Sequence, residues 1–286
     1  MLKWAALALS VAALAACSHL RDQPTGAPAV QLYAMDCGRA EFSNVDIFAD
    51  DGSFANQSRT LVNPCYLIRH PNGDLIWDTG FPDALAEAPN GLDIPQMGAH
   101  VVMRAKLADQ LAQLGLTPSD IEYVSFSHMH GDHTGNGNLF ARSTWIVDAD
   151  EREAMFSAEA RGDAQSFSGY SQLEHAQTRL IEGDGDYDVF GDGSVVIVQA
   201  PGHTPGHTVL LVRLANAGPV LLTGDLWHLA ESRERRTVPR FNVDRAQTLA
   251  SMEKVERLAA ETNARVIRQH VLEDFNALPR FPEALN

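Results

Sequence analysis

Four side chains able to bind a metal ion occur in the six-residue segment His-Met-His-Gly-Asp-His, which begins at His128 and ends at His133. His128 and His130 are two positions apart, so on an extended backbone both imidazoles point to the same side. A turn at Gly131 would then direct Asp132 and His133 toward a second position. Imidazole nitrogens and carboxylate oxygens are typical ligands of zinc and similar divalent ions. The segment therefore predicts a metal-binding loop.

Three later segments each offer one further ligand. Residues 201–208 read Pro-Gly-His-Thr-Pro-Gly-His-Thr, a tight loop from which we select His203 as the ligand. His207 is expected to hold this loop in place, although it stays open as the alternative ligand. Asp225 follows an apolar run and a Thr-Gly pair, where a strand end would let its carboxylate bridge two cations. His270 also follows a short apolar run and is the last candidate ligand in the chain.

The surrounding pattern predicts strands that deliver these loops and helices that cover them. The expected strands are 30–35, 65–68, 74–78, 121–126, 144–147, 195–198, 208–214, 220–222 and 265–268. The expected helices are 101–114, 149–158 and 244–260. Each half of the chain places strands before helices. Two sheets packed face to face, with helices outside, would satisfy this order.

The N-terminal residues are predicted to direct export instead of joining the fold. Residues 5–16 are apolar except for Ser10, which is typical of a secretory signal and too short to span a bilayer. The signal ends in Leu-Ala-Ala-Cys, which resembles a bacterial lipobox with Cys17 as the lipidated residue. Ser18, and not aspartate, follows this cysteine and favours the outer membrane. We expect a signal peptide in 1–17, a flexible tether in 18–29 and one folded domain in 30–286.

The net charge and the cysteine content limit the expected binding partners and the expected cellular compartment of the protein. The net charge of −15 repels phosphate backbones, so nucleic acid is excluded as an expected partner. Membrane contact is expected only through the lipid anchor. In an exported protein Cys37 and Cys65 are able to form a disulfide, but an inert buried thiol at Cys65 remains an equal alternative. The oligomeric state, including a homodimer, is left open.

The order of the metal-binding segments resembles that of the metallo-β-lactamase superfamily. His-x-His-x-Asp-His, Gly-His-Thr-Pro-Gly-His, Gly-Asp and a late histidine appear in that order over most of residues 30–284. The resemblance implies an α/β fold, namely a four-layer αββα sandwich with two divalent metal ions, expected to be zinc, at one edge of the sheets. It also identifies Asp78, in an Asp-Thr-Gly turn, as a residue that supports the metal loop without binding metal.

The same resemblance implies a role for each candidate ligand. One metal would be held by His128, His130 and His203, and the other by Asp132, His133 and His270. Asp225 would bridge the two ions. A hydroxide shared by the ions would attack a carbonyl, and Asp132 would pass a proton to the leaving group.

Within the superfamily, the sequence is most similar to N-acyl homoserine lactonases. The bridging aspartate and the segments 63–70, 78–80, 127–136 and 274–279 carry this similarity. It implies a small-molecule lactone or ester as substrate and quorum quenching as the role. The alternatives are a β-lactamase, another ester or thioester hydrolase of this fold, a non-catalytic lipid-anchored binding protein, or a diiron oxidoreductase. The last two are disfavoured because all the ligands are present and no flavin domain is visible.

Two positions depart from the lactonase pattern. Lactonases place a tyrosine shortly after the bridging aspartate, whereas this chain has Leu226-Trp227-His228 and no tyrosine after Asp225. Trp227 or His228 would then supply the N–H donor to the substrate, with simple packing as the alternative for Trp227. The residue after His270 is a valine, where the family has an aspartate, which leaves the support of His270 open.

Overall fold

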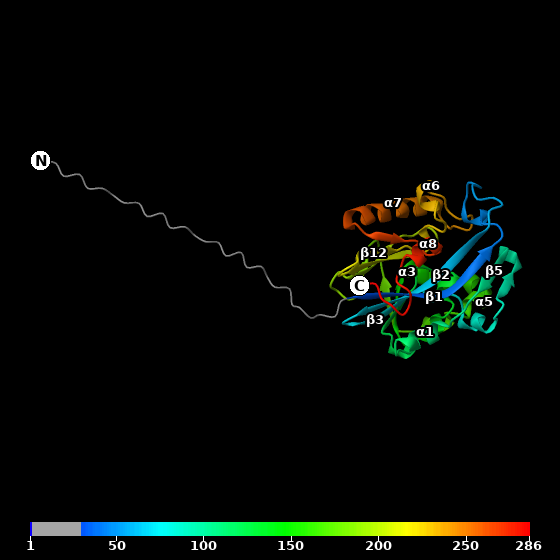
Figure 1. Ribbon diagram of the computed structural model, residues 1–286, viewed down its shortest axis with the longest axis horizontal. Coiled ribbons are helices and arrows are strands. Elements are labelled where there is room, and N and C mark those ends of the chain that lie inside the picture. The colour runs from blue at the N-terminus through cyan, green and yellow to red at the C-terminus, as the bar shows by residue number, and fades with distance from the viewer. Residues whose placement is uncertain (2–29) are drawn as a thin grey trace.

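Two β-sheets form the centre of the fold, and helices cover the outer face of each (Figure 1). The computed structural model describes Met1 and residues 30–286. The predicted signal peptide, Cys17 and the tether at 18–29 lie outside the described residues. Among those residues, no helix is both long enough and apolar enough to cross a membrane.

The larger sheet has eight strands in the order β4-β5-β1-β2-β3-β6-β7-β8, and the smaller has five in the order β13-β12-β11-β10-β9. The larger sheet contains β1 (Gln31–Phe42), β2 (Arg59–His70), β3 (Gly73–Trp77), β4 (Leu92–Ile94), β5 (Ala99–Val102), β6 (Tyr123–Ser125), β7 (Thr144–Asp148) and β8 (Thr178–Ile181). The smaller contains β9 (Tyr187–Asp188), β10 (Val195–Gln199), β11 (Thr208–Leu214), β12 (Gly218–Leu222) and β13 (Arg265–Ile267).

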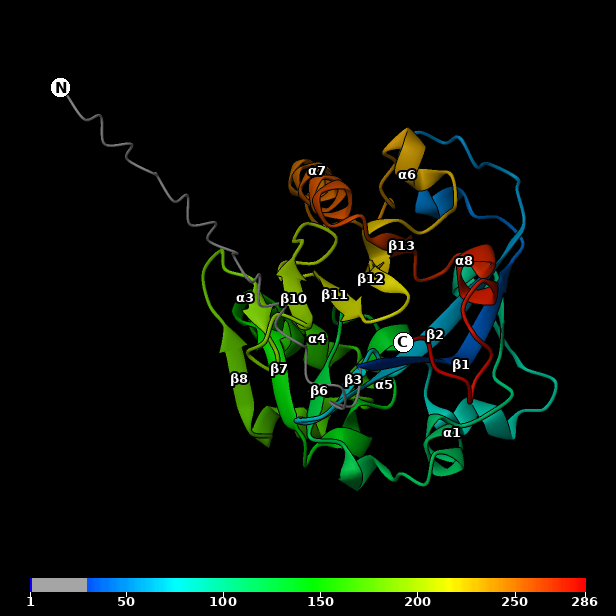
Figure 2. The same ribbon diagram turned by 60° about the vertical axis from the view of Figure 1, so that its left-hand side comes forward.

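The helices are mostly short. The α-helices are α1 (Leu107–Gln113), α2 (Gly131–Thr134), α3 (Ala149–Met155), α4 (Ala158–Gly162), α5 (Ala164–Phe167), α6 (Ser232–Arg235), α7 (Arg245–Thr262) and α8 (Leu272–Asn276). The 3-10 helices are η1 (Asp46–Phe48), η2 (Asp83–Glu87), η3 (Pro95–Met97), η4 (Pro118–Asp120), η5 (Gly137–Phe140), η6 (Ser171–His175) and η7 (Gly224–Leu226). Helix α7 lies outside the smaller sheet, and α1 and α5 lie outside the larger one, as the two views show (Figure 2).

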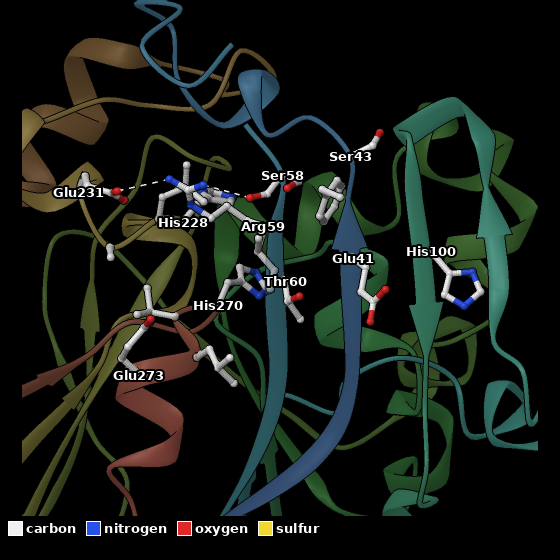
Figure 3. Close-up of a pocket in the computed structure, with 16 residues that line it drawn as sticks. Glu41, Ser43, Ser58, Arg59, Thr60, His100, His228, Glu231, His270 and Glu273 are labelled. Atoms are coloured by element: carbon white, nitrogen blue, oxygen red, sulfur yellow. Dashed lines mark hydrogen bonds and ion pairs between the residues drawn. The ribbon is translucent and has the colours of Figure 1, made fainter. Parts of the chain in front are cut away.

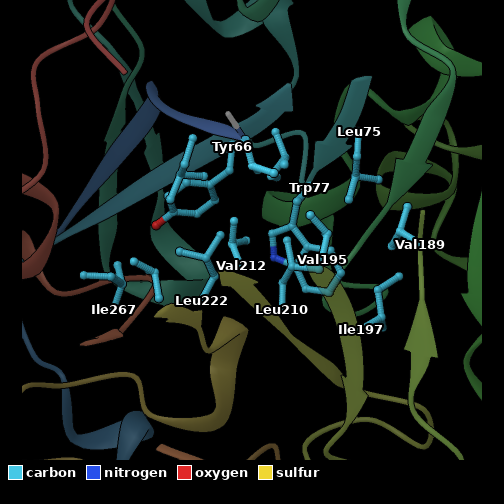
Figure 4. Close-up of a cluster of buried hydrophobic side chains, with 14 of the residues drawn as sticks. Tyr66, Leu75, Trp77, Val189, Val195, Ile197, Leu210, Val212, Leu222 and Ile267 are labelled. Carbon is cyan, nitrogen blue, oxygen red and sulfur yellow. The ribbon is translucent and has the colours of Figure 1, made fainter. Parts of the chain in front are cut away.

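Alternating side chains on the strands fill the space between the sheets. On β2, Tyr66 and Ile68 face the smaller sheet, while Cys65 and Leu67 face the helices on the other side. On β11, Leu210 and Val212 meet them in the inter-sheet cluster (Figure 4). Because successive side chains of a strand point to opposite faces, each sheet buries both surfaces. This arrangement confirms the predicted αββα sandwich.

The strand directions bring the predicted metal loops to one edge. Strands β3, β6, β7 and β8 pair in parallel, as do β12 and β13, whereas β11 is antiparallel to both β10 and β12. Strand β10 therefore runs in the same direction as β12 and β13. The loops that follow β6, β10, β12 and β13 carry His128, His203, Asp225 and His270 respectively. Since the ends of strands that run in one direction meet at one edge of a sheet, this topology gathers His203, Asp225 and His270. The loop after β6, in the other sheet, is tied to them where the backbone N–H of Thr208 donates to the carbonyl of Ser127 at 2.8 Å.

The helix predicted at 101–114 is wrong in its first half. Val101 and Val102 belong to β5, where Val101 pairs with Ala40 of β1, and the helix begins only at Leu107. A β-branched pair fits a pleated edge better than a helix. Leu107 and Leu111, one helical turn apart, are fully buried and explain why the later part is helical.

Candidate metal centre

The loop after β6 changes direction at a single helical turn. His130 has an extended conformation at the N-cap of α2, whose four residues 131–134 include Asp132 and His133. The turn places Nε2 of His128 2.8 Å from Nδ1 of His130, while Asp132 and His133 form a separate group with His270. The predicted division of this segment into two pairs is therefore what the structure shows.

Ligand atoms from four loops converge in two groups. The first donor group consists of His128, His130, His203 and Asp225, and the second consists of Asp132, His133 and His270. Within each group the potential ligand atoms all lie within 4.8 Å of one another. All seven side chains that the sequence singled out as ligands are thus brought together, and all except His130 and Asp132 are buried.

The carboxylate of Asp225 lies between the two donor groups. Its Oδ2 is 3.5 Å from Nε2 of His128 and 3.4 Å from Nε2 of His203. Its Oδ1 is 3.2 Å from Nε2 of His133 and 2.9 Å from Nε2 of His270. One oxygen therefore faces each group, which is the placement expected of a bridging carboxylate.

The electrostatics differ between the two groups. Burial lowers the pKa of His130 to about 3 and holds the pKa of His128 well below its usual value, so both imidazoles are neutral with free lone pairs. Burial also opposes protonation of His133 and His270, yet the carboxylate of Asp225 holds the pKa of both above the ordinary range. A cation entering the second donor group must therefore displace protons.

The donor set fits a pair of divalent cations. Nε2 of His133 and Oδ1 of Asp225 are buried and lie 3.2 Å apart as an ion pair that lacks hydrogen-bond geometry. A buried polar atom without a hydrogen bond costs about 1–3 kcal/mol, so both atoms would gain from a cation placed between them. Imidazoles and carboxylates without cysteine suit zinc and related divalent ions.

Asp78 supports the second donor group from behind. Its Oδ1 accepts the backbone N–H of Ser127 at 2.7 Å, and its Oδ2 lies 3.0 Å from Nδ1 of His133. This contact keeps the proton of His133 on Nδ1 and leaves Nε2 free to bind a cation. The next residue, Thr79, donates its backbone N–H to the carbonyl of His133 at 2.6 Å. Asp78 therefore occupies the supporting position that the resemblance implied.

His207 supports the bridging carboxylate and belongs to neither donor group. Its Nε2 accepts the backbone N–H of Asp225 at 3.0 Å, and its Nδ1 faces the carbonyl of Ala200 at 3.0 Å. Burial lowers its pKa to about 3, so the ring stays neutral and keeps both contacts. Gly224, at φ +48°, permits this approach because a Cβ there would lie 2.8 Å from Nε2 of His207. The geometry favours His203 as the ligand.

His270 finds its support in the backbone of β2. Its Nδ1 lies 2.8 Å from the carbonyl of Val62, and the amide of Gln269 donates to the carbonyl of Pro64 at 2.8 Å. These contacts hold the end of β13 and His270 in a chain whose next residue is Val271. Asn63 of the same strand also donates its side-chain amide to the carbonyl of Asp132 at 2.5 Å.

Glu151 is a residue that sequence reasoning missed. It lies on α3 and is 2% exposed, and its carboxylate accepts backbone N–H groups from two of the metal loops. The available signal was an Asp-x-x-Glu pattern at 148–151, which marks the start of a helix. That pattern predicts a glutamate turned back to its own helix, whereas Glu151 points outward into the loops.

A cleft of about 680 Å³ opens beside His228 and His270 (Figure 3). Its rim carries the carboxylates of Glu41, Glu231 and Glu273, and Arg59 lies 3.6 Å from Glu231. The cleft therefore gives access to the donor groups through a wall that is mainly acidic.

The two candidate substrate contacts are placed differently. Nε2 of His228 lies 2.9 Å from Oδ2 of Asp225, and burial lowers the pKa of this imidazole to about 4. The ring of Phe241, 41% exposed, lies 5.7 Å from that of His228. Trp227 instead lies in the core cluster beneath α7, with the guanidinium of Arg233 over its ring. This placement favours packing for Trp227, the alternative that the sequence left open, and not a substrate contact.

Comparison with known proteins places this geometry in a family. The family model of the metallo-beta-lactamase superfamily matches residues 59–270. The N-acyl homoserine lactonase AttM of Azorhizobium caulinodans is 33% identical over 264 residues, covering 89% of this chain and 97% of that protein. The N-acyl homoserine lactonase AiiA of Bacillus thuringiensis subsp. kurstaki is 28% identical over 259 residues, covering 88% of this chain and 98% of that protein.

A solved structure agrees with the sequence relatives. An N-acyl homoserine lactone hydrolase with the product N-hexanoyl-L-homoserine at its catalytic metal centre superposes with a TM-score of 0.74 and 25% identity. The match covers 89% of this chain and 98% of that one. The matching overall fold, the convergent donor groups and the matched family model agree. The chain belongs to the metallo-β-lactamase superfamily.

Proposed function

We propose that this protein is a dinuclear metal-dependent hydrolase that opens the ring of N-acyl homoserine lactones. The observation that carries the proposal is the carboxylate of Asp225, which directs one oxygen toward each donor group. The first donor group would hold one metal, the second would hold the other, and Asp225 would bridge them. Relatives over 88–89% of the chain are N-acyl homoserine lactonases, which supports a lactone as substrate.

The reaction adds water to the lactone carbonyl and breaks the ring C–O bond, which gives an N-acyl homoserine. Two divalent ions, with zinc as the proposed metal, would acidify a shared water and polarise the carbonyl. Asp132, 30% exposed in its side chain, would receive a proton from that water on a carboxylate oxygen and deliver it to the departing ring oxygen. The proton that leaves the water thus ends on the new hydroxyl group.

His228 and Phe241 would position the substrate. His228 lines the cleft, and its neutral ring has one N–H, which faces Oδ2 of Asp225 in this structure. Once cations bind that carboxylate, this N–H would donate to the acyl amide or the lactone carbonyl. Phe241 would offer its exposed ring to the acyl chain. The acidic rim favours a neutral lactone over a β-lactam, because the ring carboxylate of a β-lactam would face Glu41, Glu231 and Glu273 against a single arginine.

A lactone panel tests this proposal. We expect the zinc- or cobalt-loaded protein to open N-acyl homoserine lactones, and we expect Asp225→Ala to abolish the activity. Penems and aryl esters serve as competing substrates. Intact lactones together with efficient cleavage of either competitor would show that the substrate assignment is wrong.

We also propose that the enzyme is exported and anchored by a lipid at Cys17 on the periplasmic side of the outer membrane. The disulfide between Cys37 and Cys65 supports export, because such bonds persist in oxidising compartments. Fractionation of cells that express the wild type or Cys17→Ala tests the anchor. We expect only the variant to leave the membrane fraction, and equal membrane retention of both would contradict the anchor.

A further inference from the structure

We propose that Glu151 is a positioning residue that fixes the spacing of the two histidine loops of the first donor group. One carboxylate oxygen accepts the backbone N–H of Met129 at 2.6 Å, and the other accepts that of Gly206 at 2.8 Å. Met129 lies between His128 and His130, and Gly206 lies three residues after His203. A single side chain therefore ties together two loops that are far apart in the sequence. This inference rests on the proposed metal-dependent function.

The contacts of Gly206 show that the loop is closely seated on α3. A Cβ at position 206 would lie 2.3 Å from Oδ1 of Asp148, 2.6 Å from the backbone nitrogen of Glu151 and 2.7 Å from its Cβ. Asp148 caps α3 by accepting the backbone N–H groups of Asp150 and Glu151. The helix start is thus built without help from the Glu151 side chain. That side chain is free to serve the metal loops.

The burial of Glu151 is not explained by the helix alone. A glutamate at the third position of a helix is normally solvated or bonded to the cap, whereas Glu151 is 2% exposed. Burial raises the pKa of its carboxyl to about 7, and the carboxylate of Asp148 acts in the same direction. Only the ionised carboxylate offers both oxygens as pure acceptors to the two N–H groups. Burying an ionised carboxylate costs free energy. We infer that Glu151 is retained because it aligns Nε2 of His128 with Nε2 of His203.

Glu151→Gln and Glu151→Asp test the role in different ways. The glutamine has nearly the same shape, but its NH₂ group would face one of the two backbone N–H donors. The aspartate keeps the charge but is one methylene shorter, so it cannot reach both loops. Glu153→Gln, an exposed position on the same helix, is the matched control. Zn²⁺ and Co²⁺ are the probes, and binding is measured by competition with a chelator, without any lactone.

We expect Glu151→Gln to weaken metal binding by about 10–100-fold, as is typical when a residue that orients metal ligands is lost. Glu151→Asp should lie between it and the wild type, and Glu153→Gln should match the wild type. Hydrogen exchange should accelerate in the peptides at 127–134 and 201–207 of both Glu151 variants, and not only in α3. If Glu151→Gln does not fold, the aspartate variant and its exchange pattern decide the question.

Wild-type affinity and unchanged exchange of both loops in the folded variants would overturn the inference. Because neither measurement uses a substrate, a protein that binds two metals but opens no lactone would refute the proposed substrate and leave this test intact.

Discussion

Replacing Asp78 by asparagine should weaken the binding of one metal without unfolding the protein. The asparagine oxygen must face the backbone N–H of Ser127, now 2.7 Å from Oδ1, because that N–H has no other role than to donate. Its NH₂ group then faces Nδ1 of His133 in place of the carboxylate oxygen at 3.0 Å. Nδ1 then keeps only the hydroxyl of Ser127, at 3.1 Å, as an acceptor for its proton, so the tautomer with the proton on Nε2 gains population. Nε2 is the atom that faces Asp225 and the second donor group.

The size of the effect follows from these contacts. The Asp78→Asn substitution removes a hydrogen bond to a charged group, worth about 1.5–3 kcal/mol, from the His133 tautomer that binds metal. At about 1.4 kcal/mol for each factor of ten, this corresponds to a loss of roughly 10–100-fold in affinity. The measured range for residues that orient metal-binding histidines is about the same. The affinity of the first donor group for metal should change much less, because Asp78 contacts none of the side chains of that group directly.

Isothermal titration of metal-free protein with Co²⁺, together with elemental analysis, measures this loss. Asp192→Asn is the matched control, because Asp192 also faces a histidine, with Oδ2 3.0 Å from Nε2 of His70. The expected result is two equivalents for the wild type and the control, and one tight and one weak equivalent for Asp78→Asn. Two equally tight equivalents in Asp78→Asn would show that Asp78 does not orient His133 for metal binding.

Three further predictions concern pH, packing and the disulfide. As pH falls, metal should leave the second donor group first, because its imidazoles have raised pKa values and regain protons while His130, at about 3, stays neutral; loss of both metals in one step during a pH titration of bound Co²⁺ would contradict this order. Gly206→Ala should lower the free energy of unfolding, measured in urea, by about 1–3 kcal/mol and weaken metal binding, because its Cβ would clash with α3. Gly185→Ala, which lies in open space, should change neither the free energy of unfolding nor metal binding. Replacing Cys37 and Cys65 by alanine should lower the free energy of unfolding by about 3–4 kcal/mol, the chain-entropy value for a separation of 28 residues; a urea midpoint equal to that of the wild type would count against the bridge.

The metal loops were predictable because the types and the spacing of their ligands are visible within short stretches of sequence. His128 to His133 supplies four ligands locally, and Asp225 and His270 follow apolar runs that are strands β12 and β13. Their convergence was expected from the resemblance to the metallo-β-lactamase superfamily, and the strand directions that produce it are seen in the structure. The sandwich and the seven converging side chains were therefore accessible from the sequence.

Other features depend on contacts between distant segments and left no local signal. Glu151 resembles an ordinary residue of a helix start, and its two loop partners lie 22 and 55 residues away. The support of His270 comes from a backbone carbonyl 208 residues earlier, which no side-chain motif encodes. Trp227 and His228 are neighbours in the sequence, but His228 lines the cleft and Trp227 packs in the core. The path of the backbone after η7 decides which of the two side chains reaches the cleft.

The most direct test of this account is a crystal of the zinc-loaded protein measured with anomalous scattering at the zinc edge. We predict two peaks on either side of the Asp225 carboxylate, one among His128, His130 and His203, and the other among Asp132, His133 and His270. A single peak, or peaks away from Asp225 in protein that opens lactones at full rate, would contradict it.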